Sequence, residues 1–155
     1  MRKSLLTSLL ATAAGVGMTA SWAGQVVGPV RLQDQFGHEH TLAADTRRIY
    51  FTHDMDGGKL LKAALGDRGQ AVLDAQHAVA ITDISGMPAM IRRMMALPAM
   101  KKRSYRIWLD ATGKLVAGWP REPGKVTVME LDDFSITGTT FAGDEPTLEA
   151  IVQPR

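Results

Sequence analysis

Short runs of β-branched and aromatic residues alternate along the chain with segments whose apolar residues recur every three or four positions. The run Arg48–Thr52, which reads Arg-Ile-Tyr-Phe-Thr, is typical of a buried strand. Ala78–Ile84 is almost continuous in apolar side chains, as expected of a central parallel strand. Together these patterns predict strands over Val30–Leu32, His40–Leu42, Arg48–Thr52, Ala78–Ile84, Tyr105–Leu109, Lys114–Ala117, Val126–Leu131 and Ile136–Phe141.

Helical spacing predicts helices over Lys59–Leu65, Gln70–Gln76, Pro88–Leu97 and Thr147–Val152. In and just before the third of these, Met87, Met90, Ile91, Met94 and Leu97 fall three and four residues apart, which indicates a face packed against the core. Met95 lies off this face, and we expect it to be exposed. Strands separated by helices in this order predict a single α/β domain with a central mixed sheet flanked by helices.

The first residues have the pattern of a secretory signal peptide. Arg2 and Lys3 are followed by the mostly apolar stretch Leu5–Met18, and Ser21-Trp22-Ala23 provides small residues around a cleavage site. The apolar stretch is shorter than the roughly 20 residues that a membrane-spanning helix needs. We therefore predict a signal peptide over residues 1–23 and one domain over 24–155, which is periplasmic or secreted and has no stable membrane span after cleavage.

The charge of the chain changes when this leader is removed. The whole sequence has 18 Lys and Arg against 16 Asp and Glu. Loss of Arg2 and Lys3 leaves 16 of each, and hence a formal net charge of zero. A nucleic-acid partner is therefore not expected, because phosphates favour a clear basic excess.

Three stretches occur in a characteristic order: Leu32-x-Asp34-x-x-Gly37 before Thr41-Leu42, the strand–helix–strand from Ile49 to Ile84, and Tyr105–Asp110 before Gly113-Lys114-Leu115-Val116. In this order they resemble exported thioredoxin-like proteins and peroxiredoxins, from about Val30 to Ala117. The resemblance implies a thioredoxin-like fold. Sequences of this kind are sometimes labelled FAD- or FMN-containing dehydrogenases, but no G-x-G-x-x-G motif opens a helix after a strand here.

The chain departs from that family in its chemistry, because it contains no cysteine. In thioredoxin-like proteins the reactive Cys-x-x-Cys lies where the first central strand meets its helix. The corresponding degenerate segment here is Met55, Asp56, Gly57 and Gly58. Thiol–disulfide exchange needs a thiolate, so the usual oxidoreductase activity is excluded and no catalytic residue is assigned.

The segment around this position has donors that suit a metal or small ligand. His53 and Met55 have side chains that suit copper, and Asp54 and Asp56 suit harder cations. His38 and His40 are further candidate ligands. The simpler interpretation, which we favour, is a solvated turn in which Asp56 caps the following helix.

The methionines and basic residues after residue 86 allow several interpretations. Core packing is favoured for the methionines over copper binding or a partner groove. The basic residues form a candidate docking surface for anionic lipid headgroups or an acidic partner, against the simpler interpretation of a solvated face. This candidate surface comprises Arg92, Arg93, Lys101, Lys102 and Arg103.

The leading functional hypothesis is an exported, non-catalytic thioredoxin-fold protein that binds a partner in the cell envelope. The first alternative is a periplasmic protein that binds or delivers copper through histidine and methionine. The second is an enzyme with a small-molecule site around His53–Asp56, at the carboxyl end of the first central strand. We expect no cofactor, and the partner is an envelope protein or a small ligand.

Overall fold

A computed structural model describes residues 21–153 of the chain. A single seven-stranded sheet forms its centre, with the strand order β2-β1-β5-β4-β3-β6-β7. The predicted leader lies outside the described residues except for residues 21–23, of which Trp22 packs against the core. The strands are β1 (Arg31–Asp34), β2 (Glu39–Thr41), β3 (Arg48–Thr52), β4 (Ala78–Asp83), β5 (Ile107–Asp110), β6 (Val126–Asp132) and β7 (Ser135–Ala142).

The sheet is mixed, as the sequence predicts. β3, β4 and β5 run parallel to one another, with Arg48 opposite Ala78 and Ala80 opposite Ile107. β6 pairs with β3 in the antiparallel direction, as β1 does with β5. The carboxyl ends of the three parallel strands therefore lie at the same edge of the sheet.

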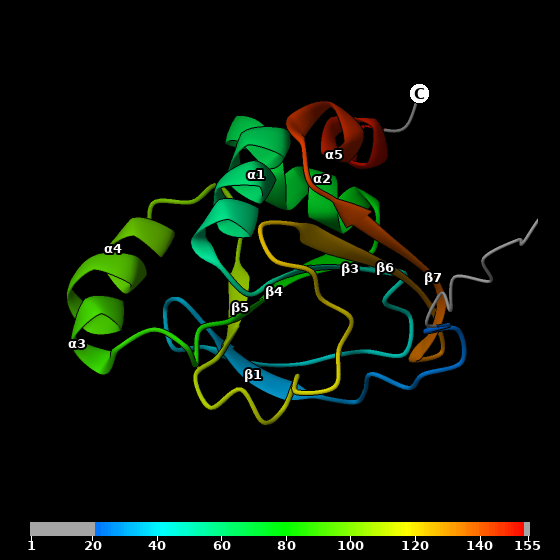
Figure 1. The fold of residues 1–155 in the computed structure, drawn as a ribbon, viewed down its shortest axis with the longest axis horizontal. Helices are drawn as coiled ribbons and strands as arrows, with labels where there is room; N and C mark the ends of the chain where they lie inside the picture. Colours follow the sequence, from blue (N-terminus) through cyan, green and yellow to red (C-terminus); the bar gives the residue numbers. More distant parts are fainter. Residues whose placement is uncertain (1–20, 154–155) are drawn as a thin grey trace, which may run out of the picture.

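Helices cover one face of this sheet (Figure 1). Leu61, Leu73 and Leu148 come from three different helices and pack on Tyr50 of β3 in one hydrophobic core. Burying these side chains supplies most of the stabilisation of this layer. The helical elements are α1 (Met55–Leu65), a short 3₁₀ turn (Gly66–Arg68), α2 (Gly69–Ala75), α3 (Ala89–Ile91), a π-helical stretch (Arg92–Ala96), α4 (Leu97–Met100) and α5 (Glu145–Val152).

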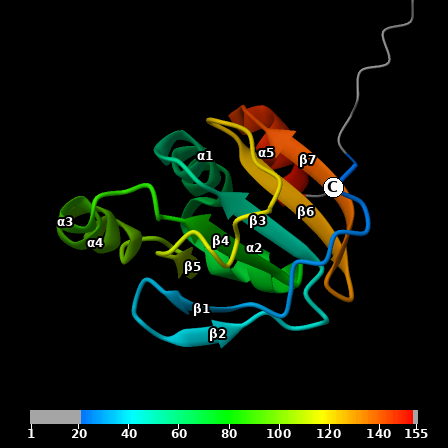
Figure 2. The same cartoon turned by 60° about the horizontal axis from the view of Figure 1, so that its bottom comes forward.

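The opposite face is covered by the amino-terminal segment, the β1–β2 hairpin and the loop after β5 (Figure 2). Ile49 and Phe51 of β3 point to this side and form a second core with Val116 and Trp119 of the loop. β3 is thus apolar on both faces, which is the pattern of a central strand.

The loop after β5 corrects one prediction, because Lys114–Ala117 is not a strand. The buried carboxylate of Asp110 accepts hydrogen bonds from the backbone N–H groups of Leu115 and Val116, at 2.9 and 3.1 Å. These amides therefore do not pair with a neighbouring strand. The apolar residues of the loop cover the second core without forming a ladder.

The methionine-rich segment corrects a second prediction. Residues 89–100, from α3 to α4, form one continuous helical rod, which we call the outer helix; it stands away from the rest of the molecule (Figures 1 and 2). The apolar face expected in the core is largely exposed, with Met90 at 74% and Met94 at 69% of their full exposure. Met95 is exposed, as predicted. The other three longer helices already occupy the sheet face, so this apolar face is left without a layer to pack on.

Candidate ligand-binding groove

A groove of about 680 Å³ lies where β3 and β4 end, between α1 and the outer helix. In open α/β sheets, ligands bind at the carboxyl ends of the strands. The volume is within the range of small-molecule sites, which is about 300–1,000 Å³. The groove is lined by Thr52, His53, Asp54, Met55, Gly58, Lys59, Leu61, Thr82, Asp83, Ile84, Gly86, Met87, Ile91, Met95, Ala96, Ala99, Met100, Arg103, Tyr105 and Ile107.

The degenerate segment Met55-Asp56-Gly57-Gly58 forms the first turn of α1, on one side of the groove. The helix begins at Met55, earlier than predicted, because Asp54 and not Asp56 is its N-cap. Gly57 is buried against a neighbouring loop, and a Cβ placed there would lie 2.8 Å from the carbonyl oxygen of Lys125. A glycine is therefore required where α1 meets this loop.

Asp54 joins α1 to that loop with its two carboxylate oxygens. Oδ1 accepts from the N–H of Gly57 at 2.8 Å, and Oδ2 accepts from the N–H of Gly124 at 2.6 Å. Burial raises the pKa of Asp54, but the hydrogen bonds from Gly124 and Gly57 and the charge of His53 outweigh it and lower the pKa below its ordinary value. The carboxylate is therefore ionised at neutral pH and engaged within the protein.

His53 lies beside Asp54 and lines the groove. Its side chain is 16% exposed, and its Nε2 lies 3.6 Å from Asp54 Oδ2. Its Nδ1 is buried and has no hydrogen-bond partner. The ring stacks on Phe51, with the two centroids 6.4 Å apart. His53 is thus an imidazole with one unpaired nitrogen, held next to an apolar groove.

The structure places the predicted metal ligands in different regions. His53 and Met55 both line the groove. His38 and His40 lie instead at the hairpin, where His40 Nε2 is 2.7 Å from the buried carboxylate of Asp34. Among the described residues, no group of three or more His, Cys, Asp or Glu is arranged to hold a metal ion. The histidines of the chain therefore do not form a common site.

Methionines, by contrast, are brought together. Met55 from α1 lines the groove with three methionines from the opposite wall, Met87, Met95 and Met100. Met87 lies in the turn just before the outer helix, and Ile91 and Met95 line the groove from the outer helix itself. The groove has a flexible thioether wall, a kind of surface that adapts to different apolar ligands.

Polar side chains at the carboxyl ends of β3 and β4 form hydrogen bonds within the protein. The hydroxyls of Thr52 and Thr82 are 2.7 Å apart. Asp83 accepts hydrogen bonds from the Ser85 hydroxyl at 2.6 Å and from Arg121 Nη1 at 2.9 Å. Burial raises the pKa of Asp83, but these two bonds outweigh it and lower the pKa. Sequence reasoning did not identify Asp83 or Arg121, because their pairing joins residues that lie far apart in the chain.

The predicted docking residues lie on and just after the outer helix. Arg103 lines the groove. Arg92 donates to the carbonyl oxygen of Ala111 at 3.3 Å. Arg93, Lys101 and Lys102 are exposed. Only Arg103 of this set borders the groove, so the basic surface and the groove are adjacent but distinct.

The arrangement is suited to binding. Asp54, Asp83 and the threonine pair are hydrogen-bonded within the protein, so their oxygens are engaged in its own structure. Burial raises the pKa of Tyr105 to about 12, so its phenol is neutral at physiological pH and is a poor proton donor or acceptor there. The remaining groove surface is mostly apolar, and apolar surface favours association with an apolar ligand.

Comparison with solved structures identifies the fold as thioredoxin-like. The chain is similar to peroxidoxin BcpB from Mycobacterium tuberculosis, with 17% identity and a TM-score of 0.52 over 83% of this chain and 89% of that one. It is similar to the exposed lipoprotein thioredoxin Etrx1 from Streptococcus pneumoniae, with 12% identity and a TM-score of 0.55 over 81% and 98% of the two chains. For StoA from Bacillus subtilis the identity is 12% and the TM-score 0.51, over 82% and 99%.

These likenesses define the fold. No protein-family model matches the chain, and no curated protein matches it in sequence. Because the chain has no cysteine, it has the fold without the thiols of thiol–disulfide exchange. Among the described residues, no helix has the length and apolar character needed to cross a bilayer.

Proposed function

We propose that this is an exported thioredoxin-fold protein that acts by binding an apolar ligand in the groove between α1 and the outer helix. The observation that carries the proposal is the methionine-lined wall of that groove, in which Met55 and Met95 are 68% and 67% exposed. The pattern of residues 1–23 supports export, and the absence of cysteine supports a binding role.

The energetics favour an apolar occupant. Apolar surface removed from water contributes about 25 cal/mol per Å², and methionine side chains repack around ligands of different shape. The internal hydrogen bonds of Asp54 and Asp83 remain intact when such a ligand enters. The occupant is either a small apolar molecule or an apolar segment of an envelope protein.

Binding of the neutral fluorescent probe N-phenyl-1-naphthylamine tests the groove. We expect saturable binding to the wild type and at least a tenfold weaker affinity in Ala99→Trp, because Ala99 lines the groove and an indole there would take up part of the space for the probe. Ala63→Trp, at an exposed position of α1 that does not line the groove, is the matched control. Equal affinity in Ala99→Trp and wild type would contradict the proposal.

A native mass spectrum of the gently purified protein distinguishes the two kinds of occupant. An added mass of a few hundred daltons indicates a small molecule, and an added polypeptide indicates a protein partner. In either case Ala99→Trp is expected to lose the added mass and Ala63→Trp to retain it.

A second candidate function is the binding of a soft metal ion such as copper(I). It is favoured by one observation: the imidazole of His53, with its unpaired Nδ1, lines the same groove as Met55, Met87, Met95 and Met100. Thioethers and imidazole are ligands that suit copper(I). These side chains come from both walls of the groove, so an ion that enters it has several candidate donors.

Replacing methionine by leucine separates the two functions, because leucine keeps the apolar volume and removes the thioether. We expect silver(I), a redox-inert stand-in for copper(I), to bind the wild type in a calorimetric titration. Affinity should fall at least tenfold in Met95→Leu/Met100→Leu and stay unchanged in Met90→Leu/Met94→Leu, which lies outside the groove. Absence of heat in the wild type would end this candidate, whereas binding of the naphthylamine probe should be similar in all three proteins.

A further inference from the structure

The charges of the chain are strongly segregated. Between Asp83 and Asp110 there is no carboxylate, and this stretch carries six cations: Arg92, Arg93, Lys101, Lys102, Arg103 and Arg106. Over residues 24–155, the remaining positions have ten Lys and Arg against sixteen Asp and Glu. The domain is therefore formally neutral as a whole, but the stretch between Asp83 and Asp110 is positive and the rest of the domain, here called the body, is negative.

Most of these cations are not neutralised within the described part of the chain. Its ion pairs leave Arg92, Arg93, Lys101, Lys102 and Arg103 without a carboxylate partner, while Arg106 Nε lies 4.0 Å from Asp34 Oδ2. When unpaired cations lie in one region of a protein and the rest is negative, the field of the protein turns the positive region toward an anionic surface. The outer helix would meet such a surface first, because it projects from the body (Figure 2).

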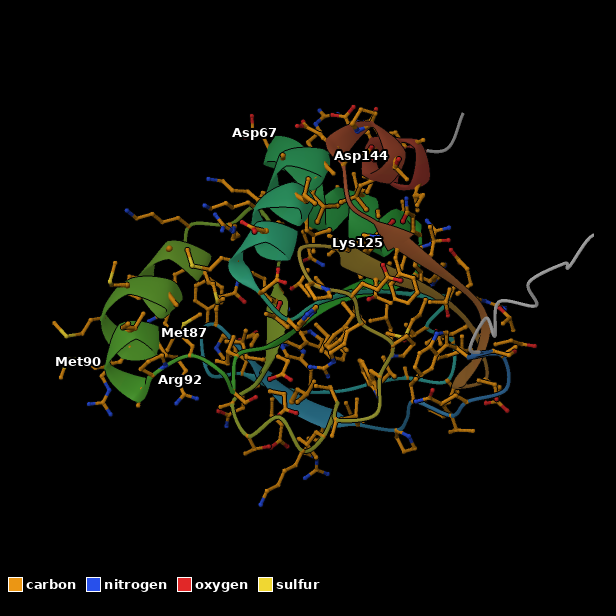
Figure 3. All side chains as sticks on the ribbon, viewed as in Figure 1. Asp67, Met87, Met90, Arg92, Lys125 and Asp144 are labelled. Atoms are coloured by element: carbon orange, nitrogen blue, oxygen red, sulfur yellow. The ribbon has the colours of Figure 1, made fainter. Side chains whose placement is uncertain are left out.

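The outer helix also exposes apolar side chains that the groove does not use. Met90 and Met94 are four residues apart, so they lie on one face of the rod, and neither lines the groove. Figure 3 shows Met90 pointing away from the rest of the molecule. Arg92 and Arg93 are on the same helix as these methionines, and Lys101 and Lys102 follow it directly. Exposed apolar residues close to basic ones are typical of a segment that lies in a membrane interface.

We propose that the outer helix docks this protein onto an anionic phospholipid surface, with Met90 and Met94 entering the headgroup region and Arg93, Lys101 and Lys102 contacting the phosphates. A fluid lipid surface suits this set because unbranched thioethers and flexible cations need no fixed partner geometry. The inference does not rest on the function of the groove, since it uses different side chains.

Co-sedimentation with vesicles tests the proposal. We expect binding to vesicles of equal parts phosphatidylglycerol and phosphatidylcholine in 0.1 M salt, and much weaker binding in 0.5 M salt because the charges are screened. Pure phosphatidylcholine vesicles should bind little. Equal binding to both vesicle types would overturn the proposal, because it would show an uptake that does not depend on lipid charge.

Paired variants assign the binding to the outer helix. Arg93→Glu/Lys101→Glu should lower the partition onto anionic vesicles at least tenfold, since each basic residue near such a surface contributes about a fivefold gain. Arg31→Glu/Arg47→Glu makes the same change of net charge at exposed residues outside the segment and should leave partition within about twofold of the wild type. Similar loss in both pairs would mean that only net charge matters, and would overturn the assignment.

The apolar contribution is measured separately. Met90→Gln/Met94→Gln keeps side-chain length and charge and should weaken the anionic-vesicle partition several-fold, with an unchanged circular dichroism spectrum. An unchanged partition would overturn insertion of the two methionines. Sedimentation velocity tests whether a second copy of the chain occupies this surface instead. That would be the conclusion if the wild type self-associates but does not bind vesicles, and if Arg93→Glu/Lys101→Glu abolishes the self-association.

Discussion

Replacing Asp110 by asparagine is expected to lower the free energy of unfolding by about 3 kcal/mol. The side chain is 1% exposed. Oδ1 accepts from the N–H and hydroxyl of Thr112 and the N–H of Gly113, at 2.8–3.0 Å. Oδ2 accepts from the N–H groups of Leu115 and Val116. Asparagine has one oxygen and one NH₂ group where aspartate has two oxygens. Its NH₂ would face either the donors around Oδ1 or those around Oδ2, and those buried N–H groups would lose their acceptor.

The effect should extend beyond the loop itself. Val116 and Trp119 of this loop cover Phe51 and the second core. The Trp119 and Phe51 rings meet edge to face, with their centroids 5.3 Å apart. Urea denaturation of both proteins measures the change. Asp67→Asn, at an exposed carboxylate, is the control and should change stability by less than about 0.5 kcal/mol. A similar small change in Asp110→Asn would contradict the structural role.

Replacing Asp54 by alanine is expected to lower the free energy of unfolding by about 2 kcal/mol. The change removes an N-cap, which contributes about 1 kcal/mol, and the bond to Gly124, whose N–H then has no acceptor. Asp144→Ala is the matched control, because Asp144 caps α5 through Thr147 alone. A smaller loss in the control isolates the contribution of the link to Gly124; an equal loss would show that the link adds nothing.

The stabilisation from Asp54 should depend on pH. Its pKa is lowered in the folded protein from an ordinary value of 3.8, so its contribution is full well above pH 3.8 and is lost as the pH falls through the folded pKa. Asp54→Asn has no charge to titrate at this position. The difference in unfolding free energy between wild type and Asp54→Asn should therefore shrink below about pH 4. A difference that is constant from pH 6 to pH 3 would contradict this assignment.

The site could be located from the sequence only in part. The sequence places the segment 53–58 after a central strand, as the structure does, because the β-branched and aromatic run Arg48–Thr52 and the following glycines mark that junction. Its cap was assigned to Asp56, whereas Asp54 caps the helix. Local spacing allows either carboxylate, and the choice is decided by Gly124, which lies seventy residues away.

The sequence allows a partner groove as one interpretation of the methionines but favours core packing. The spacing of Met87, Met90, Ile91 and Met94 correctly indicated a helix with an apolar face. The further step, that this face packs in the core, was wrong, because periodicity shows that a face is apolar and not what covers it. The methionines therefore line a groove or face outward.

The sequence by itself determined seven of the strands and the helices between them, the mixed α/β class, the lack of a thiol and the separation of cations from carboxylates along the chain. These properties follow from composition and from spacings of two to four residues, which local geometry converts directly into structure. Only the tertiary structure decided that the outer helix stands away from the sheet, that His53 and four methionines share one groove, and that Asp54 and Asp110 hold the surrounding loops. Each of those outcomes depends on partners distant in the chain or on which elements already cover the sheet, and neither is encoded in any short stretch of residues.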